Sequence, residues 1–168
     1  MKRIIFERTT GVKMPCKAHK TDAGLDFYIP NDIKYLSENG KNIVLQNIDN
    51  EMKIAIGAHD SVLIPMGIKS KFEEGNALVF FNRSGIASKK HLFRGACIVD
   101  SEYRGTIFVN LTNVSDEVQY LQPGEKLIQA MLLPVPEIEV VEDKVENDTE
   151  RGEDGFGSTN NKWGNYVF

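Results

Sequence analysis

Short runs of apolar residues, rich in valine, isoleucine and phenylalanine, recur along the chain between turn-forming residues. The spacing of these runs predicts strands at 54–56, 62–64, 77–81, 106–111, 126–133 and 138–141. Prolines fall between the runs or at their ends, as central strands require if they are to keep their ladder hydrogen bonds. No alternation of strand and helix patterns is visible. The pattern therefore indicates an all-β sandwich or jelly roll.

One segment has a different composition from the strands. Residues 84–92 (SGIASKKHL) mix small, polar and basic side chains, which is typical of a short helix. Ser84 stands at its start, where a capping hydroxyl is preferred. We expect this segment to be the one short helix of the fold.

Two further segments look separable from the strands. Residues 31–53 are polar and contain Asn39-Gly40, which predicts a hairpin insertion. Residues 142–168 begin acidic and become glycine-rich, which predicts a flexible C-terminal arm. Three aromatic residues near the end indicate that the tip of this arm docks. We therefore expect a catalytic core at 1–141, with the insertion at 31–53, and an arm at 142–168.

Length and composition fit one soluble domain of 168 residues, 41% of them apolar and 26% charged. The chain has no apolar run of membrane-spanning length, and its first residues (MKRIIFERTTGVK) carry charges where a signal peptide needs an apolar stretch. Cys16 and Cys97 are too few for a disulfide framework and are interpreted as reduced thiols. We expect a cytoplasmic protein without a membrane partner.

The net charge of −4 hides an asymmetry along the chain. Residues 137–154 hold nine acids against Lys144 and Arg151, so the remainder carries 18 basic and 15 acidic side chains, or +3. A mildly basic body suits small anionic ligands. No stripe of lysine and arginine with interleaved aromatic residues appears, so we expect no nucleic-acid partner.

Three segments carry candidate chemistry, and each also has a plain structural interpretation. Residues 82–85 (NRSG) bring a guanidinium, a hydroxyl and helix amides together, as phosphate sites do, or form a helix start with a surface arginine. Residues 95–105 predict a hairpin with Asp100 and Tyr103 at its tip, where a carboxylate could deprotonate water, or a simple turn. Residues 151–159 place an arginine, two hydroxyls and a ring on flexible backbone, or form a linker.

Taken together and in order, five segments resemble the five motifs of the trimeric deoxyuridine triphosphatase (dUTPase) family. They are 22–26 (DAGLD), 83–85 (RSG), 99–105 (VDSEYRG), 124–130 (GEKLIQA) and 151–159 (RGEDGFGST). The resemblance implies a β-barrel of the jelly-roll type that assembles as a homotrimer with shared active sites. It also implies Mg²⁺-dependent hydrolysis of dUTP to dUMP and pyrophosphate.

The same resemblance implies roles for individual residues. Asp100 would be the base for the attacking water, and Asp26 would contact Mg²⁺ through its water shell. Tyr103 would pack on the deoxyribose and exclude a 2′-hydroxyl, and Phe156 would stack on the base. The residues implied to hold the phosphates are Arg83, Ser84 and Gly85, with Gln129 nearby. A hairpin including Gly95, Cys97, Ile98 and Phe108 would recognise uracil. The other arm residues implied to bind substrate are Arg151, Gly157, Ser158 and Thr159.

Departures from the family pattern leave alternatives open. Cys97 stands where glycine is usual, so its Cβ either crowds the base or points away. A dCTP deaminase, alone or combined with dUTP hydrolysis, shares the fold but needs a glutamate where Asn110 stands. A third hypothesis is a regulatory, nucleotide-dependent binding protein on the same scaffold, which the insertion at 31–53 motivates.

Overall fold

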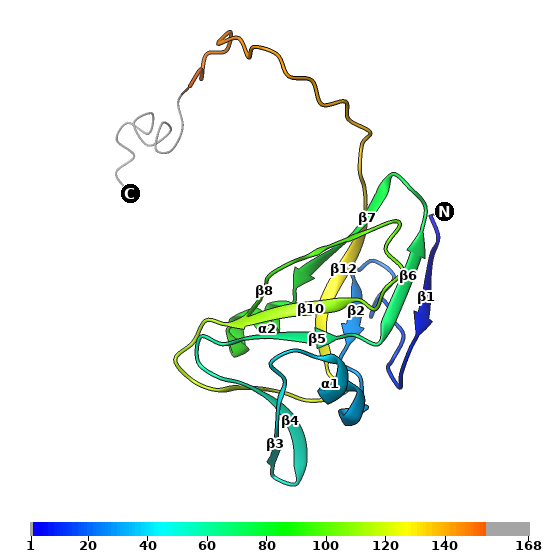
Figure 1. Ribbon diagram of the computed structural model, residues 1–168, viewed down its shortest axis with the longest axis vertical. Helices are drawn as coiled ribbons and strands as arrows, with labels where there is room; N and C mark the ends of the chain where they lie inside the picture. The colour runs from blue at the N-terminus through cyan, green and yellow to red at the C-terminus, as the bar shows by residue number, and fades with distance from the viewer. Residues whose placement is uncertain (1, 154–168) are drawn as a thin grey trace. The chain divides into compact units, whose positions relative to one another are not determined.

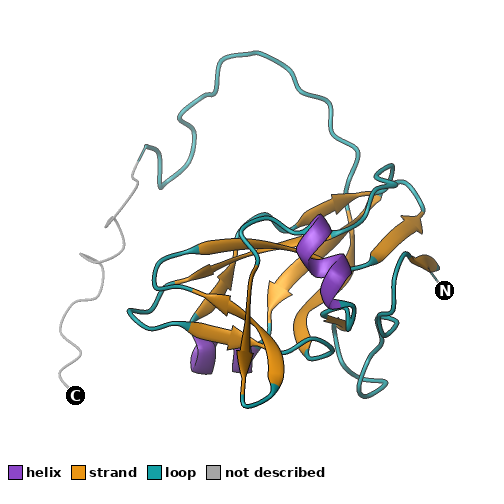
Figure 2. Ribbon diagram, turned by 60° about the horizontal axis from the view of Figure 1, so that its bottom comes forward, coloured by secondary structure: helices purple, strands orange, loops and turns teal. Residues whose placement is uncertain are grey.

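The computed structural model describes residues 2–153, and the strands dominate it (Figures 1 and 2). The strands are β1 (Ile4–Arg8), β2 (Leu25–Tyr28), β3 (Val44–Ile48), β4 (Glu51–Ile56), β5 (Ser61–Pro65), β6 (Ile68–Phe72), β7 (Asn76–Asn82), β8 (Leu92–Arg94), β9 (Ile98–Asp100), β10 (Phe108–Asn113), β11 (Gln119–Leu121) and β12 (Lys126–Pro134). The helices are α1 (Ile33–Asn39) and α2 (Ser84–Lys90). The all-β prediction is confirmed, whereas the expectation of one helix is wrong.

Four antiparallel sheets make up the core. The largest has the order β2-β12-β7-β9, and its long strand β12 is drawn in yellow in Figure 1. The others are β5-β10-β8, β11-β4-β3 and β1-β6. Alternate residues of β5 and β10, such as Val62 and Ile64 or Val109 and Leu111, are buried because successive side chains of a strand face opposite ways. The sheets therefore share one apolar interior.

Helix α1 lies in the segment that was expected to be a hairpin. The Asp32 carboxylate accepts a hydrogen bond from the Tyr35 amide at 3.0 Å, and Leu36 is fully buried. Gly40 donates to the Leu36 carbonyl and ends the helix, so Asn39-Gly40 is a helix terminus instead of a hairpin turn. The hairpin does exist further along, between β3 and β4, and its turn uses the left-handed backbone of residues 49 and 50.

Helix α2 begins one residue earlier than its sequence pattern indicated. Arg83 is the N-cap, with extended backbone and no side-chain capping bond, and Ser84 is the first helical residue. Ile86 anchors the helix to the core, and His91 ends it in the left-handed conformation with φ of 50°. The predicted serine cap is therefore wrong, and the exposed hydroxyl of Ser84 is not used as a cap.

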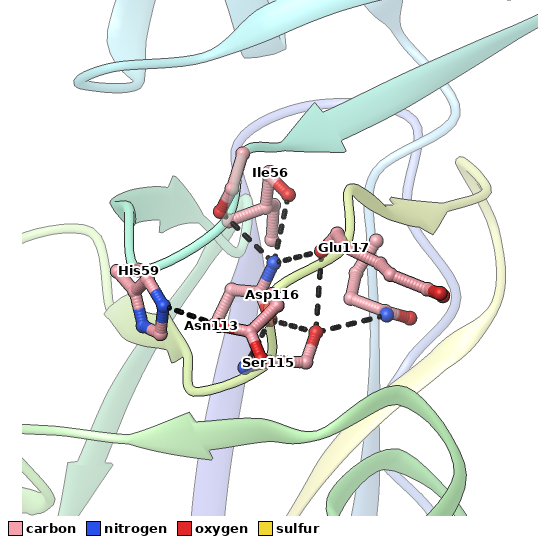
Figure 3. Close-up of polar contacts among 8 residues, drawn as sticks. Ile56, His59, Asn113, Ser115, Asp116 and Glu117 are labelled. Carbon is pink, nitrogen blue, oxygen red and sulfur yellow. Dashed lines mark hydrogen bonds and ion pairs between the residues drawn. The ribbon is translucent and has the colours of Figure 1, made fainter.

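A buried asparagine ties two loops to the end of β10 (Figure 3). Asn113 Nδ2 donates to the carbonyls of Ile56, Gly57 and Glu117 at 3.1, 2.9 and 2.7 Å. Its Oδ1 accepts from the amide and the hydroxyl of Ser115 at 3.0 and 2.8 Å. Because a buried polar group without a partner destabilises the folded state, this network holds the connected loops in one position.

The chain divides into two units, Met1–Glu137 and Ile138–Phe168. Within the second unit, the described residues 138–153 contain neither helix nor strand. The strand predicted at 138–141 is therefore wrong. Its apolar side chains are exposed, and no strand pairing among the described residues includes them. No helix between residues 2 and 153 has the length and apolar character needed to cross a membrane.

Candidate active site

The first part of the site is a carboxylate held between two cations. Asp26, on β2, accepts a hydrogen bond from Arg83 Nε at 3.1 Å and from Lys126 Nζ at 2.7 Å. The Asp26 side chain is 14% exposed, whereas those of Arg83 and Lys126 are about one third exposed. Three neighbouring charged groups therefore carry a net charge of +1, on a surface that solvent reaches.

The guanidinium of Arg83 has a second anchor. Its Nη1 donates to the carbonyl oxygen of Lys126 at 3.0 Å. Because β7 and β12 are paired, the residue that follows β7 lies beside the start of β12. Hydrogen bonding to the Asp26 carboxylate raises the pKa of Lys126 above its usual value of 10.5. Lys126 is consequently cationic at neutral pH, and the Arg83 guanidinium retains free N–H groups for an anion.

Gln129 lies directly opposite Asp26 in the pairing of β12 with β2. Its Nε2 donates to the carbonyl of Asn82 at 3.0 Å. Gly24 is buried against it, since a Cβ on Gly24 would stand 3.1 Å from Gln129 Oε1. An open hollow of 450 Å³ begins here, and its lining residues are Ala23, Gly24, Phe81, Asn82, Arg94, Gln129 and Met131.

Ser84 and Gly85 follow Arg83 on the first turn of α2. Both residues are exposed, and a Cβ on Gly85 would meet nothing within 4 Å. The structure therefore brings together the segments 22–26, 83–85 and 124–130. Sequence reasoning had assigned no role to Lys126, although its basic side chain in the fourth motif was the available signal.

The second part of the site is the turn that follows β9. Asp100 ends this strand with its side chain exposed. The Tyr103 amide donates to the Asp100 carbonyl at 3.2 Å and closes the turn. In the pairing of β9 with β7, Asp100 lies opposite Ala77. The turn is therefore located at the beginning of β7.

The two parts are far apart within one chain. Ala77 lies six residues before Arg83, which directly follows β7, and at about 3.3 Å per residue this separates the backbone positions by roughly 20 Å. The Arg83 side chain is directed to Lys126, at the start of β12, whereas Ala77 pairs with Leu133 near its end. In Figure 1, β7 runs toward α2. Asp100 and Arg83 of the same chain cannot hold one small substrate.

The segment expected to be a base-reading hairpin has a different construction. Strand β9 pairs with β7, whereas β10 pairs with β5 and β8, so residues 95–108 connect two sheets. Ile107 is buried beside the turn from β5 to β6: its amide donates to the Ile68 carbonyl at 2.8 Å, and its carbonyl accepts from the Met66 amide at 2.9 Å. The hairpin prediction is wrong because these contacts draw the second half of the segment into another sheet.

Side chains alternate along the start of this connection. Cys97 packs against the core, and its carbonyl accepts from the Phe80 amide at 2.7 Å. Ile98 faces outward and is 64% exposed. Phe108, where β10 begins, is also exposed. The Cys97 side chain therefore points away from the face on which Ile98 and Asp100 stand.

Asn110 has a structural role in β10. Its Nδ2 donates to Ser61 Oγ at 2.9 Å and to the Val62 carbonyl at 3.2 Å. Gly95 is held against this amide, because a Cβ there would lie 2.1 Å from Asn110 Oδ1. The main chain of Gly95 can pass so close only because it has no side chain.

The remaining predicted residues belong to the second unit of the chain. Arg151 is exposed among the described residues. Phe156, Gly157, Ser158 and Thr159 lie outside the described residues, as do the terminal aromatic residues. Within residues 2–153 there is no group of three histidine, cysteine, aspartate or glutamate side chains that could hold a metal ion.

Comparisons with known proteins give a consistent result. A family model described as dUTPase matches residues 47–160. A deoxyuridine 5′-triphosphate nucleotidohydrolase of Hydrogenobaculum sp. is 33% identical over 153 residues, which are 90% of this chain and 100% of that protein. One from Fusobacterium nucleatum is 32% identical over 154 residues, 90% of this chain and 92% of the relative.

Solved structures give the same fold. A mutant dUTPase of phage 80alpha superposes with a TM-score of 0.72 at 21% identity, over 93% of this chain and 98% of that one. The dUTPase of phage phi11 of S. aureus superposes with a TM-score of 0.63 at 21% identity, over 86% and 99%. These likenesses support the jelly-roll architecture. Because the family model spans more than half of the sequence and relatives above 30% identity cover nine tenths of it, the chain belongs to the dUTPase family.

Proposed function

We propose that this protein is a dUTP diphosphatase, which hydrolyses dUTP to dUMP and pyrophosphate. Its curated relatives carry that activity in their names. A structural neighbour, the phage 80alpha dUTPase, was solved with dUpNHpp. In a cell this reaction limits uracil incorporation into DNA and supplies dUMP for dTMP synthesis. Both cysteines are free, which suits the reducing cytoplasm as its location.

One observation supports a shared site above all others: the separation of Asp100 from Arg83 along β7. A general base must lie within hydrogen-bond reach of the water that it activates, and that water must lie beside the phosphates. The roughly 20 Å between the two positions forbids this within a single chain. We therefore assign each active site to two copies of the chain, with Asp100 of one meeting Arg83 of another, in the homotrimer that the resemblance to the dUTPase family implies.

Asp100 supplies the base for the chemical step. Its carboxylate accepts a proton from a water whose oxygen attacks the α-phosphorus of dUTP. The bond from the α-phosphorus to the bridging oxygen of the β-phosphate breaks, so that dUMP and pyrophosphate leave. A positioned base of this kind contributes about 10² to 10⁴ in rate. The exposed position of Asp100 leaves its oxygens available for that contact.

Arg83 and Lys126 attract the triphosphate. Arg83 presents N–H groups in a planar fork whose orientation is fixed by Asp26 and by the Lys126 carbonyl. Ser84, Gly85 and Gln129 complete the phosphate-binding group. Exposed Gly85 lets the phosphate oxygens approach the backbone closely.

Magnesium fits this site as a companion of the substrate. Both oxygens of Asp26 are paired with cations, and residues 2–153 contain no cluster of acidic side chains that could hold the ion directly. Mg²⁺ prefers octahedral oxygen ligands and keeps several waters. Asp26 would therefore reach it only through a water, while the phosphates supply the inner ligands. When bound, the ion neutralises phosphate charge. The phi11 dUTPase is described as coordinating a structural Mg(II) ion.

Uracil and deoxyribose are assigned to the connection between β9 and β10. The backbone near Gly95, Cys97 and Ile98, with Phe108, would recognise the base. Since the Cys97 side chain packs inward, its Cβ does not crowd that face. Tyr103 would cover the deoxyribose. The arm residues Arg151, Phe156, Gly157, Ser158 and Thr159 are proposed to close on the bound nucleotide.

Deamination of dCTP is disfavoured by the role of Asn110. Its amide is committed to Ser61 and Val62, and an amide cannot serve as a general base. The residue therefore supports the protein's own packing.

The test is incubation of purified protein and Mg²⁺ separately with dUTP, dCTP, dTTP and UTP, followed by chromatography of products. The proposal expects dUMP and pyrophosphate from dUTP alone. Asp100→Asn, a variant of equal size without a base, should bind nucleotide and lose about 10²-fold or more in kcat. Ammonia from dCTP would move the protein to the deaminases, and inactivity with all four nucleotides would favour a nucleotide-dependent binding protein.

A further inference from the structure

The turn from Asp100 to Thr106 is held by its own polar groups. Besides the bond from the Tyr103 amide to the Asp100 carbonyl, Arg104 donates twice from Nη1. Its acceptors are the carbonyls of Ser101, at 2.5 Å, and of Tyr103, at 3.1 Å. The backbone of the turn is thereby fixed on both sides of Tyr103.

The ring of Tyr103 is folded back onto the same turn. Its hydroxyl donates to the Thr106 carbonyl at 2.8 Å. Gly105 lies between these two residues in the sequence, and a Cβ on it would stand 2.4 Å from the tyrosine oxygen and 2.6 Å from Cζ. Contacts below 3.0 Å essentially never occur for real Cβ atoms. The ring can occupy its place only because residue 105 has no side chain.

Only one side of the ring is covered in this way. Tyr103 is 42% exposed, so its outer surface remains accessible. The position of this exposed face depends on the groups that contact the other side of the ring, namely Gly105 and the Thr106 carbonyl. A methyl group at residue 105 would push the tyrosine oxygen off the Thr106 carbonyl, so the ring would lose its fixed position and could turn away from the sugar.

We propose that Gly105 is a positioning residue for sugar discrimination, acting through Tyr103. This inference rests on the proposed dUTP hydrolysis, in which Tyr103 excludes a 2′-hydroxyl. Shape selection of this kind is sensitive to small movements, because a difference of about one heavy atom is worth roughly 10- to 200-fold. Gly105→Ala should therefore lower the ratio of kcat/KM for dUTP to kcat/KM for UTP by about 10-fold. The change should lie in KM, since Gly105 touches no reacting group.

The experiment is a double-mutant cycle read as the dUTP to UTP ratio. Gly105→Ala, Tyr103→Ala and the double variant are compared with wild type. Gly11→Ala is the matched control, because Gly11 lies in an exposed loop where a Cβ would meet nothing within 4 Å. The inference expects both single variants to lose discrimination and the double variant to lose no more than Tyr103→Ala.

Three results of the ratio measurement would overturn the inference. They are a ratio for Gly105→Ala within twofold of wild type, equal losses for Gly11→Ala, and additive losses in the double variant. Failure of the proposed function gives a different result: wild type and Gly11→Ala would then both fail to hydrolyse dUTP. A substrate-independent fall in kcat would indicate damage to the Asp100 turn and would also count against a role in sugar selection.

Discussion

If each active site combines Asp100 of one copy with Arg83 of another, two inactive variants should restore activity when they assemble together. The chosen variants are Asp100→Asn and Arg83→Ala. The first removes the base and keeps the volume of the side chain. The second removes the guanidinium, and Asp26 keeps Lys126 as a partner, so no unpaired carboxylate is left. Each variant alone should have low activity.

The size of the recovery follows from the geometry. In equal mixtures that assemble at random, a site is intact when its Asp100 comes from an Arg83→Ala chain and its Arg83 from an Asp100→Asn chain. Each condition holds for half of the copies, so about one quarter of the sites in a symmetric oligomer are intact. A site formed within one chain would have no intact copies, because every chain carries one of the two changes.

The assay is steady-state dUTP hydrolysis after the two variants are unfolded in urea, mixed equally and refolded together. Wild type refolded in the same way sets the full activity, and variants refolded separately set the background. Mixing Asp100→Asn with a chain that carries both changes is the matched control, because no site then contains an intact Asp100. A true mixture no more active than its separate components would refute the shared site and the strand-separation argument behind it.

Three further predictions concern stability. Asn113→Ala should lower the free energy of unfolding by about 3–5 kcal/mol, because several buried groups lose their partner. The control is Asn39→Ala at an exposed position, which should lower it by about 0.5 kcal/mol or less. Both are measured by urea titration at fixed subunit concentration, and equal losses would contradict the prediction. The raised pKa of Lys126 means that its pairing with Asp26 stabilises the protein at neutral pH and fades as pH rises beyond about 10.5, so Lys126→Gln should flatten the alkaline loss of stability. The pKa of Asp32 is lowered by the Tyr35 amide, so its contribution is present above pH 3.8 and disappears as pH falls through the lowered value; Asp32→Ala should weaken the acid dependence.

Strand prediction from the sequence succeeded where apolar alternation coincides with a paired partner. Residues 126–133 and 77–81 are examples, and they became the paired strands β12 and β7. The strand predicted at 138–141 does not form. The spacing of apolar residues indicates which side chains face the same way, but it does not indicate whether another strand is available for pairing. Helix α1 was missed because it is short and polar, with Leu36 as its only buried residue.

The candidate site divides in the same way. Arg83, Asp100 and Tyr103 could be predicted from local motifs, because the chemistry of each side chain indicates its role without reference to other segments. The pairing of Lys126 with Asp26 depends on the register between β2 and β12, which no local pattern encodes. Gly105 also escaped notice, since only the folded position of the tyrosine ring explains why a side chain is excluded there.

Asn110 also restricts the directions in which this sequence can evolve. Its amide nitrogen is the donor for Ser61 and Val62, and Gly95 is packed against its oxygen. A glutamate at this position has no donor at neutral pH and is one methylene longer. It would set a carboxylate against the Val62 carbonyl and crowd Gly95. A glutamate at position 110 would therefore fit only if β5 and the β8–β9 connection changed with it.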